Sequence, residues 1–132
     1  MRICFIGPAM SDCGGVQRVM ATIANGLDKS HEVVIISLNN RGTDSFYRLN
    51  DKIKVINYNE YGNDKRVIAR LIRGVARKTG CALKAEVAQY AYYPEKAVDK
   101  LCELIRSGEY DCVIASTIQC TILAGLIAEQ LK

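Results

Sequence analysis

Two short apolar runs separated by an amphipathic segment constrain the fold more than any other feature of this sequence. The runs are Arg2–Gly7 and Glu32–Leu38, and runs of this length and composition are typical of strands buried on both faces of a parallel sheet. Between them, apolar residues recur at three- and four-residue steps, which predicts a helix from about Val16 to Asp28. Strand, helix and strand together form a βαβ unit, whose crossover makes the two strands parallel neighbours. The expected inward face of the helix consists of Val16, Val19, Met20, Ile23 and Leu27.

The remaining apolar segments extend this pattern. Lys52–Asn57 predicts a third strand near a sheet edge, because lysines interrupt it, and Tyr110–Ser116 predicts a fourth. Helices are expected at Pro94–Ser107 and Thr121–Leu131. The 132 residues are enough for one domain with its own core. The sequence therefore predicts an α/β fold, a three-layer Rossmann-like domain whose parallel sheet has the strand order 3-2-1-4.

Paired glycines stand where the first strand gives way to the helix. Gly14 and Gly15 open the helix, and the first turn of a helix has free N–H donors and the positive end of the peptide dipole. This arrangement predicts a site for phosphate. The alternative is purely structural: the glycines supply a turn with positive φ and let the helix pack close to the strand.

Two common nucleotide-binding motifs are excluded. An NAD-binding unit needs Gly-x-Gly-x-x-Gly and an acidic residue at the end of the second strand, which here ends Ser37-Leu38-Asn39-Asn40. A P-loop needs a lysine after its glycines, and none follows Gly15 at that spacing.

The register of the first forty or so residues resembles the opening of the family 4 retaining glycosyltransferases. The matching runs are Gly14-Gly15-Val16-Gln17-Arg18-Val19, Ile23-Ala24-Asn25-Gly26-Leu27 and His31-Glu32-Val33-Val34-Ile35. Two positions depart from the family pattern: Gln17 stands where Glu is commoner, and Ser30 stands where Gly usually precedes the histidine.

The resemblance implies one half of a GT-B architecture. Residues 1–132 would be the N-terminal, acceptor-side domain, a fragment that lacks the C-terminal donor-binding domain with its catalytic glutamates. The activity implied is transfer of a sugar, with retention, from a nucleotide-sugar donor to a glycan or lipid-linked acceptor. No cofactor and no obligatory metal are implied, and the isolated chain is expected to be inactive.

The resemblance also suggests site residues. Gly14 and Gly15 would approach the donor phosphates, while Gln17, Arg18, Ser116 and Thr117 would line the cleft. Two alternatives stay open at this point. Arg18 can be a solvent-facing helix residue, and Ser116 or Thr117 can simply cap the last helix.

Residues 65–84 form the most basic part of the chain, with seven basic residues and no acid. Their spacing predicts a basic amphipathic helix. Its basic residues Arg66, Arg70, Arg73 and Arg77 could dock on an anionic membrane surface, or the helix could pack on the sheet with a solvated basic face. Nucleic acid is not an expected partner, because aromatic residues are not interleaved with the charges. The competing functional hypothesis is a stand-alone α/β binding module that docks on a membrane or a partner through this helix.

The cysteines point away from metal binding. The six cysteines include no Cys-x-x-Cys pair, and His31 is the single histidine. They are expected to be reduced thiols, mostly buried, with Cys13 beside the glycines as a spectator. No stretch approaches the roughly 20 apolar residues of a membrane span. The expected location is the cytoplasm, with peripheral attachment to the inner face of the membrane.

Overall fold

The computed structural model describes residues 1–40, 42, 44–59, 74–75, 78–80 and 95–130, without the side chains of residues 95, 119 and 130. The membrane-surface candidates Arg66, Arg70, Arg73 and Arg77 lie outside the described residues.

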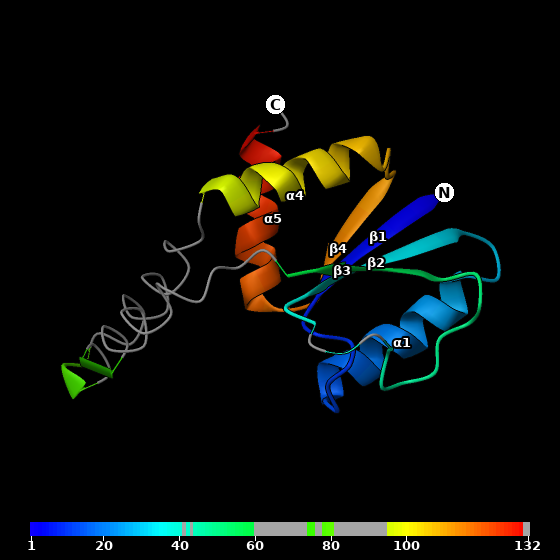
Figure 1. Ribbon diagram of the computed structural model, residues 1–132, viewed down its shortest axis with the longest axis horizontal. Coiled ribbons are helices and arrows are strands. Elements are labelled where there is room, and N and C mark those ends of the chain that lie inside the picture. Colours follow the sequence, from blue (N-terminus) through cyan, green and yellow to red (C-terminus); the bar gives the residue numbers. More distant parts are fainter. Residues whose placement is uncertain (41, 43, 60–73, 76–77, 81–94, 131–132) are drawn as a thin grey trace.

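Four parallel strands form the sheet (Figure 1). In spatial order they are β3 (Lys54–Tyr58), β2 (Glu32–Leu38), β1 (Arg2–Gly7) and β4 (Cys112–Ala115). The predicted order 3-2-1-4 is confirmed, with β3 beginning two residues later than expected and β4 shorter at both ends. Arg2 pairs with Glu32 and Gly7 with Ser37, so β1 and β2 begin and end level with each other.

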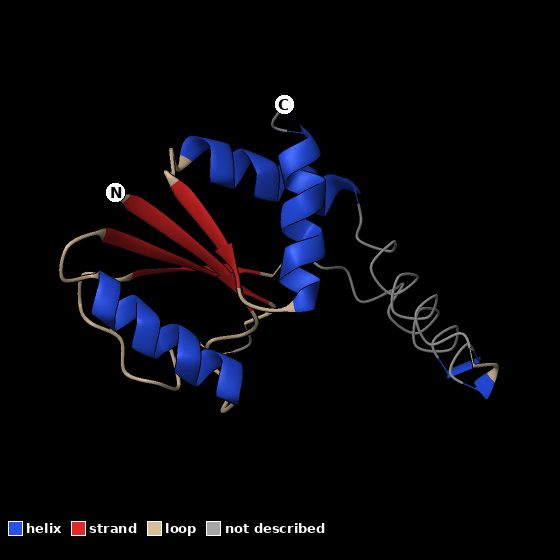
Figure 2. Ribbon diagram, turned by 180° about the vertical axis from the view of Figure 1, so that it is seen from behind, coloured by secondary structure: helices blue, strands red, loops and turns tan. Residues whose placement is uncertain are grey.

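Helices cover both faces of the sheet and complete three layers (Figure 2). On one face α1 (Gly15–Leu27) packs its Met20 and Ala24 against Phe5 and Ile35. On the other face α4 (Glu95–Ser107) and α5 (Ile118–Gln130) enclose a second core. That core includes Cys4, Ile6, Ile36, Leu101 and Leu123. This is the predicted Rossmann-like arrangement.

The inward face of α1 differs from the prediction. Val16, Val19 and Ile23 are exposed, contrary to the prediction, whereas Met20 is buried and Leu27 packs against the core as predicted. The other buried positions of the helix are Gln17, Ala21 and Ala24. The helix is therefore rotated about its axis, with its short alanine side chains toward the sheet. Met20 lies over Gly7, where any Cβ would collide with the methionine sulfur, so the missing side chain at Gly7 gives Met20 its place.

The thiol of Cys4 makes the stability of this core sensitive to alkaline pH. Burial raises the pKa of Cys4 from 9.0 to about 12. Between these two values the unfolded chain loses the thiol proton while the folded chain keeps it, so stability present below pH 9 is lost as pH rises. The unfolding free energy should fall by about 1.4 kcal/mol per pH unit over this range from Cys4 alone.

Urea unfolding at about pH 8.5 and about pH 10.5, under reducing conditions, measures this slope. Cys4→Ala should show a shallower slope than the parent. Val34→Ala is the control, because Val34 is buried beside Cys4 in the register and does not titrate. It should lower stability equally at both pH values, and equal slopes for the parent and Cys4→Ala would contradict the assignment.

Candidate functional site

The candidate site lies at the carboxyl ends of the strands. The β1–α1 loop leaves Gly7, the residue opposite Ser37 at the end of β2. Ser116 follows β4, and its backbone N–H donates to the Ile6 carbonyl at 3.0 Å, which brings the end of β4 to the same place. In open α/β sheets this edge is where ligands bind.

The first turn of α1 offers uncapped backbone donors. Its first helical hydrogen bond runs from the Arg18 N–H to the Gly14 carbonyl at 3.1 Å. The N–H groups of Gly15, Val16 and Gln17 come before that bond and have no acceptor within the helix. No side chain caps this end, and the first turn contains no acidic residue. The turn therefore presents partial positive charge with nothing of its own to neutralise it.

The structure around Gly14 differs from that around Gly15. Gly14 is extended, with φ −154° and ψ 161°, and a Cβ there would collide with the Gln17 Oε1 atom. Gly15 is exposed, and a Cβ there would meet nothing within 4 Å. Neither has a positive φ. Close packing within the chain thus explains Gly14, whereas among the described residues no contact or backbone conformation requires glycine at position 15, and the same holds for Gly26.

The side chains of Gln17 and Arg18 lie in opposite environments. Gln17 is buried, and its Nε2 donates to the Ala9 carbonyl at 3.1 Å. Its side chain therefore holds the β1–α1 loop through this hydrogen bond. Arg18 is exposed at the start of α1, which agrees with the alternative of a solvent-facing helix residue.

Ser116 and Thr117 are both engaged with the chain. The Ser116 hydroxyl donates to the Ile6 carbonyl at 3.0 Å and lies next to Gly7. Thr117 Oγ1 accepts a hydrogen bond from the Cys120 N–H at 3.2 Å. The capping interpretation therefore describes Thr117, which caps α5, while Ser116 joins β4 to the start of the loop.

The loop itself is held by residues that were not among the predicted site residues. Ser37 Oγ accepts from the Met10 N–H at 2.9 Å, and Asn40 Oδ1 accepts from the Ser11 N–H at 3.3 Å. Both side chains are buried. The sequence signal for Ser37 is its hydroxyl in an otherwise apolar strand, since strand interiors rarely bury a polar group without a partner.

Cys13 lies at the exposed end of this loop, beside Gly14. Its sulfur is 3.8 Å from the Tyr47 hydroxyl, and this hydrogen bond is the main reason that the pKa of Tyr47 is raised. The thiol is therefore accessible and sits next to the uncapped turn. By contrast Cys4, Cys102 and Cys120 are buried, as the sequence predicts for most of the thiols.

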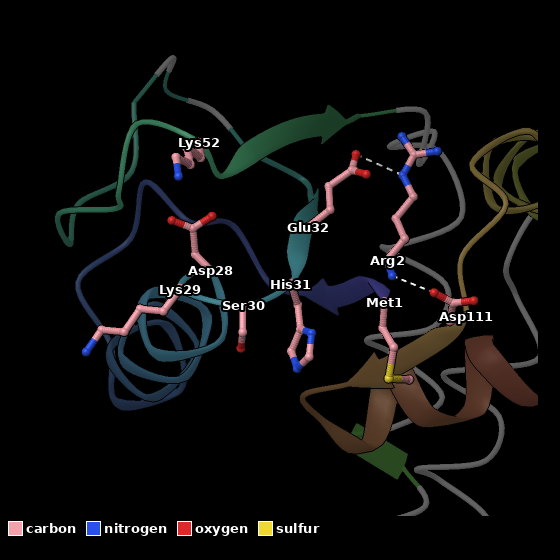
Figure 3. A pocket seen from close by; sticks show the side chains of 9 residues that line it. All are labelled: Met1, Arg2, Asp28, Lys29, Ser30, His31, Glu32, Lys52 and Asp111. Carbon is pink, nitrogen blue, oxygen red and sulfur yellow. Dashed lines mark hydrogen bonds and ion pairs between the residues drawn. The ribbon is translucent and has the colours of Figure 1, made fainter.

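A separate cavity of about 620 Å³ lies at the opposite, amino end of the strands (Figure 3). Arg2 dominates its polar contacts. Its backbone N–H donates to Asp111 at 2.6 Å, and its Nε lies 2.9 Å from Glu32, without alignment for a hydrogen bond. Its guanidinium also donates to the Gly108 carbonyl and covers the Tyr110 ring. These contacts tie together the amino ends of β1, β2 and β4, so Arg2 has a structural role there.

Neither a metal centre nor a membrane span is found in the part of the chain that the structure describes. No three side chains of His, Cys, Asp or Glu within it are grouped to hold a metal ion. None of its helices is long and apolar enough to cross a bilayer.

Comparison with known proteins gives a partial match of functional interest. No family model matches the chain. A segment of 64 residues, 48% of this chain, is 38% identical to a Campylobacter jejuni subsp. jejuni serotype O:2 enzyme. That enzyme is the GalNAc-alpha-(1->4)-GalNAc-alpha-(1->3)-diNAcBac-PP-undecaprenol alpha-1,4-N-acetyl-D-galactosaminyltransferase. The matched segment spans 17% of the relative's length. The similarity supports a glycosyltransferase as the class of a longer protein to which such a segment belongs.

Proposed function

We propose that this chain is the N-terminal, acceptor-side domain of a GT-B glycosyltransferase of the family 4 type. In this proposal the first turn of α1 receives the diphosphate of a nucleotide-sugar donor. One observation carries it: the first turn of α1 has three uncapped N–H groups, and Gly15 leaves the space in front of them open. Gly26 in the same helix is equally open, so what distinguishes Gly15 is its place beside these N–H groups.

The chemistry follows from the charge that develops during sugar transfer. As the bond between sugar and phosphate breaks, negative charge grows on the diphosphate leaving group. Fixed N–H dipoles aimed at that charge stabilise the transition state without reorganising. We assign this role to the N–H groups of Gly15, Val16 and Gln17, with the exposed guanidinium of Arg18 adding positive charge.

The other half of the reaction belongs to residues beyond this chain. Catalytic glutamates and most donor contacts would come from a C-terminal domain, and transfer would proceed with retention. Ser116, beside Gly7, is the candidate for contact with the acceptor, and Thr117 maintains the helix end next to it. The relative's acceptor is linked to undecaprenol through a diphosphate, which makes a lipid-linked saccharide the acceptor class for this chain as well.

A lipid-linked acceptor places the enzyme at a membrane surface. The basic segment 65–84, with Arg66, Arg70, Arg73 and Arg77, is the sequence feature suited to an anionic surface. We therefore propose peripheral attachment to the inner face of the membrane from the cytoplasm. The complete polypeptide is here the full-length enzyme of the proposal, in which residues 1–132 are followed by the donor-binding domain. If vesicles of anionic lipid bind this chain while nucleotide sugars do not bind the complete polypeptide, the stand-alone binding module is the better hypothesis.

Replacing Gly15 by leucine should abolish donor binding without unfolding the domain. The new side chain would fill the space that the phosphate oxygens need and would cost charged hydrogen bonds. Affinity for a nucleotide sugar should fall about 10- to 100-fold. Calorimetric titration of the complete polypeptide with UDP-sugars and GDP-sugars measures the change.

Gly26→Leu is the matched control. Gly26 is an exposed glycine in the same helix, and a Cβ there would also meet nothing within 4 Å, but it lies at the far end of α1. Both variants should keep the parent's unfolding midpoint or exceed it, because leucine favours a helix more than glycine does. Unchanged donor affinity in Gly15→Leu would remove the phosphate site from α1.

Bound donor should protect Cys13 from alkylation. The thiol is exposed beside Gly14, so a diphosphate on the first turn of α1 would cover it, whereas buried Cys4 should stay unreacted throughout. Peptide mapping by mass spectrometry, with iodoacetamide as the reagent, follows each site separately. The labelling rate of Cys13 should drop several-fold at saturating donor in the parent and in Gly26→Leu, but not in Gly15→Leu. A rate that donor does not alter in the parent would contradict the proposed site.

A further inference from the structure

Three buried polar side chains, two amides and one serine hydroxyl, lie together beside the β1–α1 loop. They are Gln17, Ser37 and Asn40, with exposed fractions of 7%, 0% and 4%. Gln17 belongs to α1, Ser37 is the last residue but one of β2, and Asn40 follows β2 in the next turn. All three form hydrogen bonds to the backbone of three consecutive residues, Ala9, Met10 and Ser11.

The three bonds hold both kinds of backbone group in the loop. Gln17 donates to the Ala9 carbonyl, while Ser37 and Asn40 accept from the N–H groups of Met10 and Ser11. Burying a polar side chain costs free energy unless it is hydrogen-bonded, and apolar residues of similar size would fill the same space without that cost. What polar residues add is direction, because each bond fixes one backbone group at a defined distance and angle.

Further hydrogen bonds hold Asn40 and the loop in place. The Asn40 side chain donates to Asn57 Oδ1 of β3 at 2.6 Å. Asn39, just before it, has a φ of 58°, a left-handed conformation that asparagine tolerates better than most residues. The Met10 carbonyl also accepts from the Phe46 N–H at 2.8 Å. The loop is thus tied to β2, to β3 through Asn40, and to the segment before β3.

Gln17 connects the loop Ala9–Ser11 directly to the uncapped first turn of α1. Its side chain binds the loop at Ala9, and its own backbone N–H is one of the three free donors of α1. Its Oε1 lies where a side chain of Gly14 would be, so the amide also fixes the approach of the chain into the helix. A shift of the loop would therefore shift the direction of the free N–H groups.

We propose that Ser37, Asn40 and Gln17 are positioning residues that fix Ala9–Ser11 and thereby aim the first-turn N–H groups of α1 at a diphosphate. This inference rests on the function proposed above. It gives the three side chains a role in ligand affinity beyond their contribution to stability, and it predicts that the two can be separated by experiment.

The test compares Ser37→Ala and Gln17→Met with a control that loses a buried hydrogen bond elsewhere. The control is Tyr58→Phe, because the buried Tyr58 hydroxyl donates to the Ala97 carbonyl at 2.5 Å in the other core. Urea unfolding measures stability, and calorimetry with UDP and with GDP as probes measures affinity, both on the complete polypeptide. All three variants should lose stability, but only Ser37→Ala and Gln17→Met should bind the parent's nucleotide more weakly, by about ten-fold.

Backbone amide chemical shifts of this chain, measured by NMR without ligand, provide a second readout. Ser37→Ala and Gln17→Met should displace the amide resonances of Gly15 and Val16, whereas Tyr58→Phe should leave them in place. The Ser37 hydroxyl bonds to Met10 in the loop, on a different element from these amides. Its removal can therefore reach them through a change in loop position, which makes the shift a demanding test.

The outcomes separate this inference from the proposed function. If the parent binds neither UDP nor GDP, the proposed function fails, and unchanged amide resonances in Ser37→Ala would overturn the positioning role as well. If the parent binds one of these nucleotides and both variants bind it equally well, the diphosphate site stands and the positioning role is overturned. Weaker binding in both variants, with displaced Gly15 and Val16 resonances and an unaffected control, supports it.

Discussion

Every other part of this structure takes its position from β1. The strand pairs with β2 on one side and β4 on the other, and its side chains alternate between the two cores. At its amino end, Arg2 joins the starts of the neighbouring strands through Glu32 and Asp111. At its carboxyl end, Gly7 gives room to Met20 and so brings α1 close to the sheet. The direction of α1, and of its uncapped turn, is therefore set by the packing of one central strand.

The candidate site relies on backbone groups more than on side chains. Gly14 leaves room for the side-chain amide of Gln17, and the space beside Gly15 is open, which is where we propose that the diphosphate binds. Peptide N–H groups do not titrate near neutral pH, and their direction is fixed once the helix forms. In a site of this kind the surrounding residues must position the backbone accurately, because no flexible side chain can adjust to the ligand. In the proposed function, this requirement gives the hydrogen bonds of Gln17, Ser37 and Asn40 to the loop before α1 their purpose.

The strand order was predictable from sequence, and the orientation of α1 was not. Short apolar runs and right-handed crossovers leave few arrangements for β1, β2 and β3. On α1, however, apolar residues occupy more than one side of the helix, so periodicity alone does not select Ala21 and Ala24 over Val19 and Ile23 as the buried set. The glycine pair was visible in the sequence, but the different surroundings of Gly14 and Gly15 were not. The contact between Ser37 and Met10 joins residues 27 positions apart, and no local pattern could predict that proximity in space.

The two edges of the described sheet differ in how they meet solvent. Strand β3 exposes Lys54 at its edge, whereas β4 consists of Cys112, Val113, Ile114 and Ala115, with no charge and with Val113 38% exposed. Charged residues on an edge strand oppose pairing with another chain. An edge strand without charge leaves its unpaired backbone N–H and C=O groups open to pairing with a strand of another molecule. Among the described strands, β4 is therefore the edge that least opposes pairing with another chain. Because association of folded chains makes apparent stability depend on protein concentration, dilution is a useful control in measurements of folding.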